Sequence, residues 1–170
     1  MKQLFAPWRH AWVTSAAARE GEPAEEGGAS SAGACLFCRV WGNPGDDPAN
    51  LVVHRGALVL VMLNRYPYNG GHLLVAPREH CGALEDLSVG ARAECVEMAA
   101  LALRALGRLY RPDGYNLGLN QGRAAGAGIP DHVHLHIVPR WNGDTNFMTT
   151  VGDARVVSQD LSKAREELAA

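Results

Sequence analysis

Three histidines, His132, His134 and His136, alternate with apolar residues in the C-terminal part of the chain. Residues two apart in a β-strand share one face, so the imidazoles would line one side while Val133 and Leu135 enter the core. Near pH 7 a neutral imidazole nitrogen is free to attack phosphorus, to move a proton or to bind a metal. Histidine is not a common residue, so a solvated face that uses three by chance is the weaker interpretation.

A glycine-rich loop, from Gly122 to Pro130, directly precedes these histidines. Glycines let the backbone approach a ligand closely, and successive N–H groups can form an anion-binding nest. Alone, such a loop is better explained as a flexible connector, but its place before three aligned histidines favours a phosphate site. The loop residues that we predict at the substrate are Gly122, Arg123, Gly126, Ala127 and Gly128.

Two of the four cysteines are spaced as Cys35-Leu-Phe-Cys38. The first residues of the chain do not resemble a signal peptide, so this pair indicates metal ligands or redox groups before a structural disulfide. The spacing resembles half of a zinc site, which His80 and His132 could complete. Cys81 and Cys95 have no such partners, and we expect both to be unliganded.

The elements that must position these groups follow from apolar periodicity and turn residues. Strands are predicted over 51–53 and 57–63, which a turn at Arg55-Gly56 would join as a hairpin, and over 72–76, 115–120 and 132–138. Helical spacing after Ser88 predicts a long helix that ends before Pro112. We also expect a polar helix over residues 159–170. Consecutive strands with one long helix inserted predict an α+β fold on an antiparallel sheet of about five strands.

The chain has 170 residues, which is enough for one domain with its own core. We expect an N-terminal arm and flexible loop over 1–34, the domain over 35–150 and a C-terminal tail helix over 151–170. The arm carries Trp8 and Trp12, and it is too apolar to remain in water. We therefore expect it to pack on the domain or on a second subunit.

The formal net charge of −2 argues against a general nucleic-acid binder, which would carry a basic face. A small anionic ligand remains compatible, because a pocket can be locally positive. No stretch approaches the roughly 18 apolar residues of a membrane span. We therefore expect a cytoplasmic protein without a nucleic-acid or membrane partner.

The His-x-His-x-His pattern with apolar residues between resembles the signature of the histidine triad (HIT) superfamily. The resemblance extends from Cys35 to about Phe147, and it includes Asn64-Arg65, Gly71-His72, Asn120-x-Gly122, Ala125-Gly126 and Pro139-Arg140. Within the superfamily the chain is most similar to the bacterial and mycobacterial diadenosine tetraphosphate phosphorylase group. The three segments that carry this closer likeness are Leu4-x-Ala-Pro-Trp-Arg9, Asn64-Arg-Tyr-Pro-Tyr-Asn69 and Pro139-Arg-Trp-Asn-Gly-Asp-Thr-Asn-Phe147.

The resemblance implies a HIT-like fold and a role for each polar residue. His134 would attack the α-phosphorus of an adenine nucleotide and form a nucleotidyl-histidine intermediate. His136 and His72 would donate hydrogen bonds to the α-phosphate oxygens. Asn120 would orient the scissile phosphate, and Asn64 would contact the ribose.

The resemblance also implies a metal and a partner. In zinc-containing relatives a histidine at the position of His80 joins the first triad histidine, here His132, and the two cysteines. A closed Cys2His2 tetrahedron would be structural, so we expect zinc at Cys35, Cys38, His80 and His132 to connect the N-terminal segment with the triad strand. Family members pair edge to edge, so we expect a homodimer.

We expect phosphate to be the second attacker, so that diadenosine tetraphosphate and phosphate yield ATP and ADP. Arg123 or Arg140 could hold the incoming phosphate by a bidentate contact, and a solvated surface position is the alternative for both. Many relatives have Gln or Ser just before the triad, where this chain has Ala127-Gly128-Ile129. Help for the leaving group must then come from backbone N–H groups or from elsewhere.

Three other functions stay open. With water as the attacker, the chain would be a hydrolase of dinucleoside polyphosphates or nucleoside phosphoramidates. The three histidines could together bind a catalytic metal, although such sites usually recruit carboxylates and no HxxxD or ExxH pattern adjoins them. A non-catalytic nucleotide-binding module is the third, but binding alone would not require a nucleophile at His134.

Overall fold

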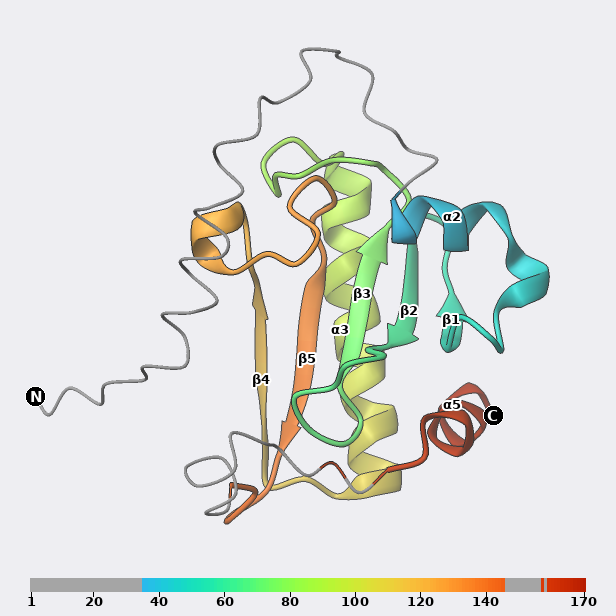
Figure 1. The fold of residues 1–170 in the computed structure, drawn as a ribbon, viewed down its shortest axis with the longest axis vertical. Helices are drawn as coiled ribbons and strands as arrows, with labels where there is room; N and C mark the ends of the chain where they lie inside the picture. Colours follow the sequence, from blue (N-terminus) through green and yellow to red (C-terminus); the bar gives the residue numbers. More distant parts are fainter. Residues whose placement is uncertain (1–34, 146–156, 158) are drawn as a thin grey trace, which may run out of the picture.

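Five antiparallel strands form one sheet in the order β1-β2-β3-β5-β4 (Figure 1). The structure is a computed structural model that describes residues 35–145, 157 and 159–170. The strands are β1 (Val52–Arg55), β2 (Val59–Leu63), β3 (Leu73–Pro77), β4 (Gly114–Leu119) and β5 (Leu135–Arg140). With one long helix and a C-terminal helix, this arrangement confirms the predicted α+β fold.

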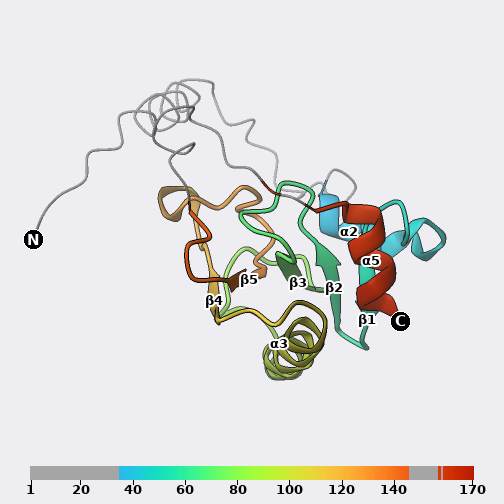
Figure 2. The same ribbon diagram turned by 90° about the horizontal axis from the view of Figure 1, so that it is seen from below.

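The long helix α3 (Val89–Tyr110) packs along one face of the sheet (Figure 2). It begins as predicted at Ser88, whose side-chain oxygen accepts a hydrogen bond from the backbone N–H of Ala91. Its buried stripe joins Val61, Val75 and Ile137 in the main core. The C-terminal helix α5 (Leu161–Ala169) packs on the same core through Ala164.

The opposite face of the sheet is covered at β1 to β3 by a seven-residue helix, α2 (Leu36–Gly42), which the sequence analysis did not predict. Its Phe37 and Val40 are completely buried against Leu60, Met62 and Leu74. Two short 3-10 turns, η2 (Pro44–Asp46) and η3 (Arg123–Ala125), lie in connecting loops. The first cysteine, Cys35, is the N-cap residue directly before α2.

The histidine strand begins later than predicted. Periodicity predicts a strand over 132–138, whereas β5 runs from Leu135 to Arg140, because its pairing with β3 starts only at Leu135 opposite Val75. His132 and His134 precede the paired ladder, and the Val133 N–H donates to the Cys81 carbonyl instead, at 2.7 Å. Pro139 does not end β5, since β3 pairs only as far as Ile137 and leaves no donor to be lost on that side.

The register decides which way His136 faces. His136 pairs with Leu74 of β3, whose side chain belongs to the cluster under α2, and with Gly118 of β4. Leu135 and Ile137 therefore enter the core under α3, as the alternation predicts. The site lies on the α2 side of the sheet.

Part of the predicted organisation falls outside the described residues, including the aromatic arm within 1–34 and the segment 146–156. The boundaries 1–34, 35–150 and 151–170 thus stay a prediction. Among the helices in the described part of the chain, none is both long and apolar enough to cross a membrane.

Candidate functional site

The imidazole of His134 is held in one tautomer by the backbone carbonyl of His132. Its Nδ1 lies 2.8 Å from the carbonyl oxygen of His132, and because a carbonyl only accepts, Nδ1 carries the proton. The Phe37 ring packs against the imidazole with a centroid separation of 4.9 Å. His134 is 6% exposed and borders a cavity of about 580 Å³. Its unprotonated Nε2 is therefore the nitrogen left for a ligand.

Burial determines the charge of this imidazole. Removal from water lowers the pKa of His134, and the hydrogen bond to the His132 carbonyl offsets only part of that effect. The ring is therefore neutral near pH 7. A neutral imidazole with a free nitrogen is a competent nucleophile.

A second pair of imidazoles is ordered by one backbone amide. The Tyr68 N–H donates to Nδ1 of His72 at 3.0 Å, so this nitrogen is an acceptor and the His72 proton sits on Nε2. That Nε2 lies 2.9 Å from Nδ1 of His136 and donates to it. The remaining His136 proton is then on Nε2, which is the nitrogen available to the cavities that His136 lines.

This geometry changes the predicted role of His72. The resemblance implied direct hydrogen bonds from both His72 and His136 to the α-phosphate. His72 is completely buried and its Nε2–H donates to His136, so it has no proton to offer a ligand. His72 is a positioning residue in this structure, and His136 is the member of the pair that reaches the cavities.

Both members of the pair are neutral at physiological pH. Burial, followed by the neighbouring imidazoles of His136 and His134, lowers the pKa of His72 to about 3. Burial and then His134 lower the pKa of His136 to about 4. Neutral rings keep the hydrogen bond between them, whereas two charged rings would repel each other.

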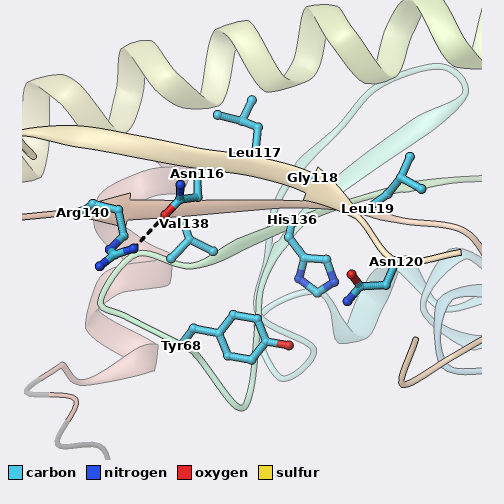
Figure 3. Close-up of a pocket in the computed structure, with 9 residues that line it drawn as sticks. All are labelled: Tyr68, Asn116, Leu117, Gly118, Leu119, Asn120, His136, Val138 and Arg140. Atoms are coloured by element: carbon cyan, nitrogen blue, oxygen red, sulfur yellow. Dashed lines mark hydrogen bonds between the residues drawn. The ribbon is translucent and has the colours of Figure 1, made fainter. Parts of the chain in front are cut away.

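Two cavities meet at His136, and both are lined by Tyr68, Asn120 and His136. The larger has a volume of about 580 Å³ and a mainly apolar wall, to which Leu36, Phe37, Met62, Leu74 and Ile129 contribute. The smaller, of about 280 Å³, lies over β4 and β5 (Figure 3). An apolar cavity with a few polar groups at one end has the character of a small-molecule site.

The structure brings some predicted substrate residues to these cavities and not others. Asn64, Gly126 and Gly128 line the larger cavity, and Asn120 lines both. The predicted loop residues that line neither are Gly122, Arg123 and Ala127. Part of the expected anion nest is also used internally, because the N–H groups of residues 125 to 127 donate to carbonyls of Gly122 and Arg123.

Arg140 lines the smaller cavity, but its guanidinium is already engaged. Its Nε and Nη2 donate to the two carboxylate oxygens of Asp144 at 2.5 and 2.8 Å, and its Nη1 donates to Asn116 at 2.8 Å. The bidentate edge predicted to hold phosphate is therefore occupied by a carboxylate. The guanidinium also holds the pKa of Asp144 well below its usual range.

The same carboxylate connects two segments that carried the closer family likeness. The Asn69 amide donates to Asp144 at 2.8 Å and to the Pro139 carbonyl at 3.0 Å. Residues 64–69 and 139–144 thus form one hydrogen-bonded unit. Tyr68, whose N–H orders the imidazole pair, precedes Asn69 in this unit.

Cys35, Cys38, His80 and His132 form a cluster with the donors of a metal site. Their ligand atoms all lie within 4.8 Å of one another, and three of the S···N separations are 3.2, 3.3 and 3.6 Å. Tetrahedral zinc with ordinary bond lengths requires S···N separations of about 3.5 Å. His132 presents Nδ1 to the sulfurs while its Nε2 donates to the Pro77 carbonyl at 2.9 Å, which is the outer hydrogen bond that orients a ligating histidine. The donor set fits zinc.

Sequence reasoning missed Tyr68, Phe37 and the two arginines that border the larger cavity, Arg39 and Arg65. Phe37 lies inside the Cys-x-x-Cys spacing and Tyr68 lies in a segment singled out for its likeness. Both were therefore in view, but neither has a local pattern that marks a cavity wall. The ring contacts of Phe37 with His134 and of Tyr68 with His136 join residues that are distant in sequence.

These features define a class of protein: an α+β domain with a neutral, tautomer-fixed histidine beside a nucleoside-sized cavity and a Cys2His2 cluster at the other end of the histidine segment. Residues 46–143 match the family model described as the HIT domain. The chain belongs to the HIT family.

Relatives of known structure or name agree with this assignment. The chain is 46% identical over 123 residues to AP-4-A phosphorylase of Mycobacterium tuberculosis, covering 72% of this chain and 63% of that protein, so it spans less than two thirds of that relative. It is 35% identical to adenosine 5'-monophosphoramidase of Schizosaccharomyces pombe, over 64% of this chain and 75% of that one. A Zn-bound histidine triad family protein from Mycobacterium smegmatis has 28% identity and a TM-score of 0.66, over 82% and 93% of the two chains.

The depressed pKa values of His72 and His136 predict a stability that depends on pH. The unfolded chain binds protons at these residues near pH 6.5, whereas the folded protein does so only near pH 3 to 4. The free energy of unfolding should therefore decrease as the pH falls from about 6.5 toward 4, by at most about 1.4 kcal/mol per pH unit for each histidine. Urea unfolding of wild type and His72→Asn should show a weaker pH dependence in the variant.

The exposed His54 on β1 provides the control. His54→Asn should retain the wild-type pH dependence between pH 6.5 and 4. An equal slope in wild type and His72→Asn would contradict the assignment of two neutral, buried imidazoles.

Proposed function

We propose that this chain is an enzyme that transfers a nucleotidyl group through a covalent bond to His134. The observation that carries the proposal is the tautomer of His134, whose protonated Nδ1 is held by the His132 carbonyl and whose Nε2 borders the larger cavity. The apolar wall of that cavity suits a nucleoside, and Arg39 and Arg65 at its border suit an anion. A nucleoside 5'-phosphate bound there would bring its α-phosphorus to the histidines.

In the first step Nε2 of His134 forms a bond to the α-phosphorus while the bond from phosphorus to the bridging oxygen breaks. The leaving phosphate takes the electron pair. His136, with its proton on Nε2, donates a hydrogen bond to the α-phosphate oxygens as their charge shifts, and Asn120 orients this group. In the second step an acceptor attacks the same phosphorus and releases the neutral imidazole of His134.

We infer that the substrate is a dinucleoside polyphosphate, with diadenosine tetraphosphate as the first candidate. Support comes from the likeness to the M. tuberculosis protein named AP-4-A phosphorylase. We further propose phosphate as the acceptor, which conserves the cleaved anhydride as ADP. The support for phosphate comes from the likeness to the M. tuberculosis protein and not from the two arginines. Arg140 pairs with Asp144, and Arg123 lines neither cavity beside the histidines.

Water is the alternative acceptor, and the likeness to a protein named as a monophosphoramidase favours it. A catalytic metal held by the three histidines has less support. Their Nδ1 atoms face three different partners: the cysteine sulfurs for His132, a carbonyl for His134 and an imidazole for His136. A shared metal would require the imidazoles to converge.

The acceptor can be identified from the products. Diadenosine tetraphosphate incubated with the protein and phosphate should give ATP and ADP, separated by ion-exchange chromatography, at a rate that rises with phosphate concentration. Formation of ATP and AMP at a rate independent of phosphate would identify a hydrolase. That result would leave the covalent step on His134 intact.

His134→Asn should abolish turnover, with a loss of at least about 10⁴-fold, because an amide cannot form the phosphoramidate bond. Binding of AMP, measured by calorimetry, should change little, since asparagine keeps a polar side chain of similar size. His54→Asn on β1 is the matched control and should retain full activity. Substantial activity in His134→Asn would contradict the covalent mechanism.

We propose that Cys35, Cys38, His80 and His132 hold one structural zinc ion. Through its four ligands, zinc would connect three parts of the chain: the start of α2, the segment after β3 and the segment before β5. His134 is two residues from His132, so this link also keeps the approach to β5 in place. The zinc-bound relative supports the assignment.

Elemental analysis of protein purified without chelator should find one zinc per chain, and Cys38→Ser should lose most of it. Removal of zinc should lower the thermal midpoint, because binding free energy at a structural site contributes to folding. Cys81→Ser is the control, since Cys81 lies outside the cluster and should retain zinc. Zinc-free wild-type protein of unchanged stability would refute the site.

We further propose a homodimer and a cytoplasmic location. Several large apolar side chains on α3 and β4 are exposed, namely Val96, Leu101, Leu109 and Leu117, which supports an interface at this edge.

A further inference from the structure

The smaller cavity exists because one position of β4 has no side chain. Gly118 pairs directly with His136, and a Cβ built at Gly118 would meet no atom within 4 Å. Asn116 and Asn120, two residues away on either side, lie on the same face of the strand. The result is a groove of about 280 Å³ directly beside His136 (Figure 3).

The groove has the chemistry of a nucleoside site. Val138 lies between Tyr68 and the strands, and the amides of Asn116 and Asn120 lie toward opposite ends (Figure 3). Arg140 is the cation among the described residues that line it, and its guanidinium is bonded to Asp144 and Asn116. A neutral lining of aromatic, aliphatic and amide groups suits a base and ribose better than a phosphate.

Tyr68 provides an aromatic surface at this groove. Its ring is stacked near-parallel to His136, at 14° and 5.9 Å between centroids, yet the residue is 48% exposed. A base could stack on the accessible part of the ring, because stacking on an aromatic side chain depends little on which base is bound. The paired imidazole and phenol rings would keep this surface in place.

The position of the groove agrees with the direction in which a leaving group departs. The two cavities meet at Tyr68, Asn120 and His136. His134 lines the larger cavity and is not part of the smaller one, while His136 lines both. In phosphoryl transfer the leaving oxygen lies roughly opposite the nucleophile, and the groove is the cavity at His136 that His134 does not line.

We propose that the groove beside Gly118 binds the second nucleoside of a dinucleoside polyphosphate, the one that leaves with the displaced phosphates. This inference rests on the proposed function. The larger cavity then holds the nucleoside whose α-phosphate is attacked, and the polyphosphate chain passes His136 between the two. Gly118 is the position that keeps the second subsite open.

The test is to fill the groove from Gly118. Gly118→Ala and Gly118→Val add increasing volume, and the fold should tolerate both because no atom lies near the new Cβ and the backbone there is not left-handed. The value of kcat/KM for diadenosine tetraphosphate should fall slightly with Ala and at least about tenfold with Val. The inhibition constant of adenosine 5'-tetraphosphate, which has the same phosphate chain without a second nucleoside, should change less than twofold.

Gly114→Val is the matched control. Gly114 lies on the same face of β4, its Cβ would also meet nothing within 4 Å, and it does not line the groove. It should retain wild-type kinetics with both compounds, and thermal midpoints should show that all three variants are folded. Equal kinetics for Gly114→Val and Gly118→Val would overturn the subsite.

Other outcomes separate the two proposals. If Gly118→Val weakened both compounds equally, the groove would bind the phosphate chain or support His136, and the nucleoside subsite would be wrong. If wild-type protein failed to cleave diadenosine tetraphosphate at all, the proposed function would fall first, before any variant was compared, and the subsite with it. Cleavage by wild type together with a selective loss in Gly118→Val would support both.

Discussion

The hydrogen bond from the Tyr68 N–H to Nδ1 of His72 is the interaction on which the site depends. A backbone N–H can only donate, so it dictates that the His72 proton lies on Nε2. The Nε2–H of His72 donates a hydrogen bond to Nδ1 of His136, so the His136 proton must lie on its own Nε2, beside the cavities. Reversal of this one bond would leave His136 with a lone pair where the proposed phosphate ligand requires a donor. Burial keeps both rings neutral, so the order is stable near pH 7.

The loop that carries Tyr68 is held by residues far away in sequence. Asn69 donates to Asp144 and to the Pro139 carbonyl, and Asp144 is fixed in turn by the Nε and Nη2 groups of Arg140, which form one edge of its guanidinium. An aligned carboxylate and guanidinium of this kind give more directional restraint than a single ion pair. The physical role of the segment after β5 is therefore to anchor the loop before β3. At the other end, the contacts of Cys35 and Cys38 with His132 join the start of α2 to the segment before β5.

Much of the fold could be read from the sequence because it depends on local periodicity. Apolar runs bounded by turn residues predicted the first three strands, alternation predicted the last two, and the apolar spacing after Ser88 predicted α3 with its cap. The start of the histidine strand was wrong by three residues, since the Val133 N–H bonds to the Cys81 carbonyl and not to β3, a contact that alternation in β5 does not reveal. Helix α2 was missed because seven residues are too few for a periodic signal and Phe37 and Val40 are stabilised by the sheet beneath them.

By itself, the sequence determined which residues could do chemistry: the neutral, alternating histidines, the spaced cysteines, and a family pattern that connects them with His72, His80 and Asn120. It did not determine which atoms of these residues remain free. Arg140 is an available phosphate ligand in the sequence and a partner of Asp144 in the structure, and His72 is a donor in the sequence and a positioning group in the structure. A hydrogen-bonding atom serves the partner nearest to it. The pairing of β3 with β5 brings His136 to His72, the pairing of β4 with β5 brings Asn116 to Arg140, and the turn after β5 brings Asp144 to the same guanidinium.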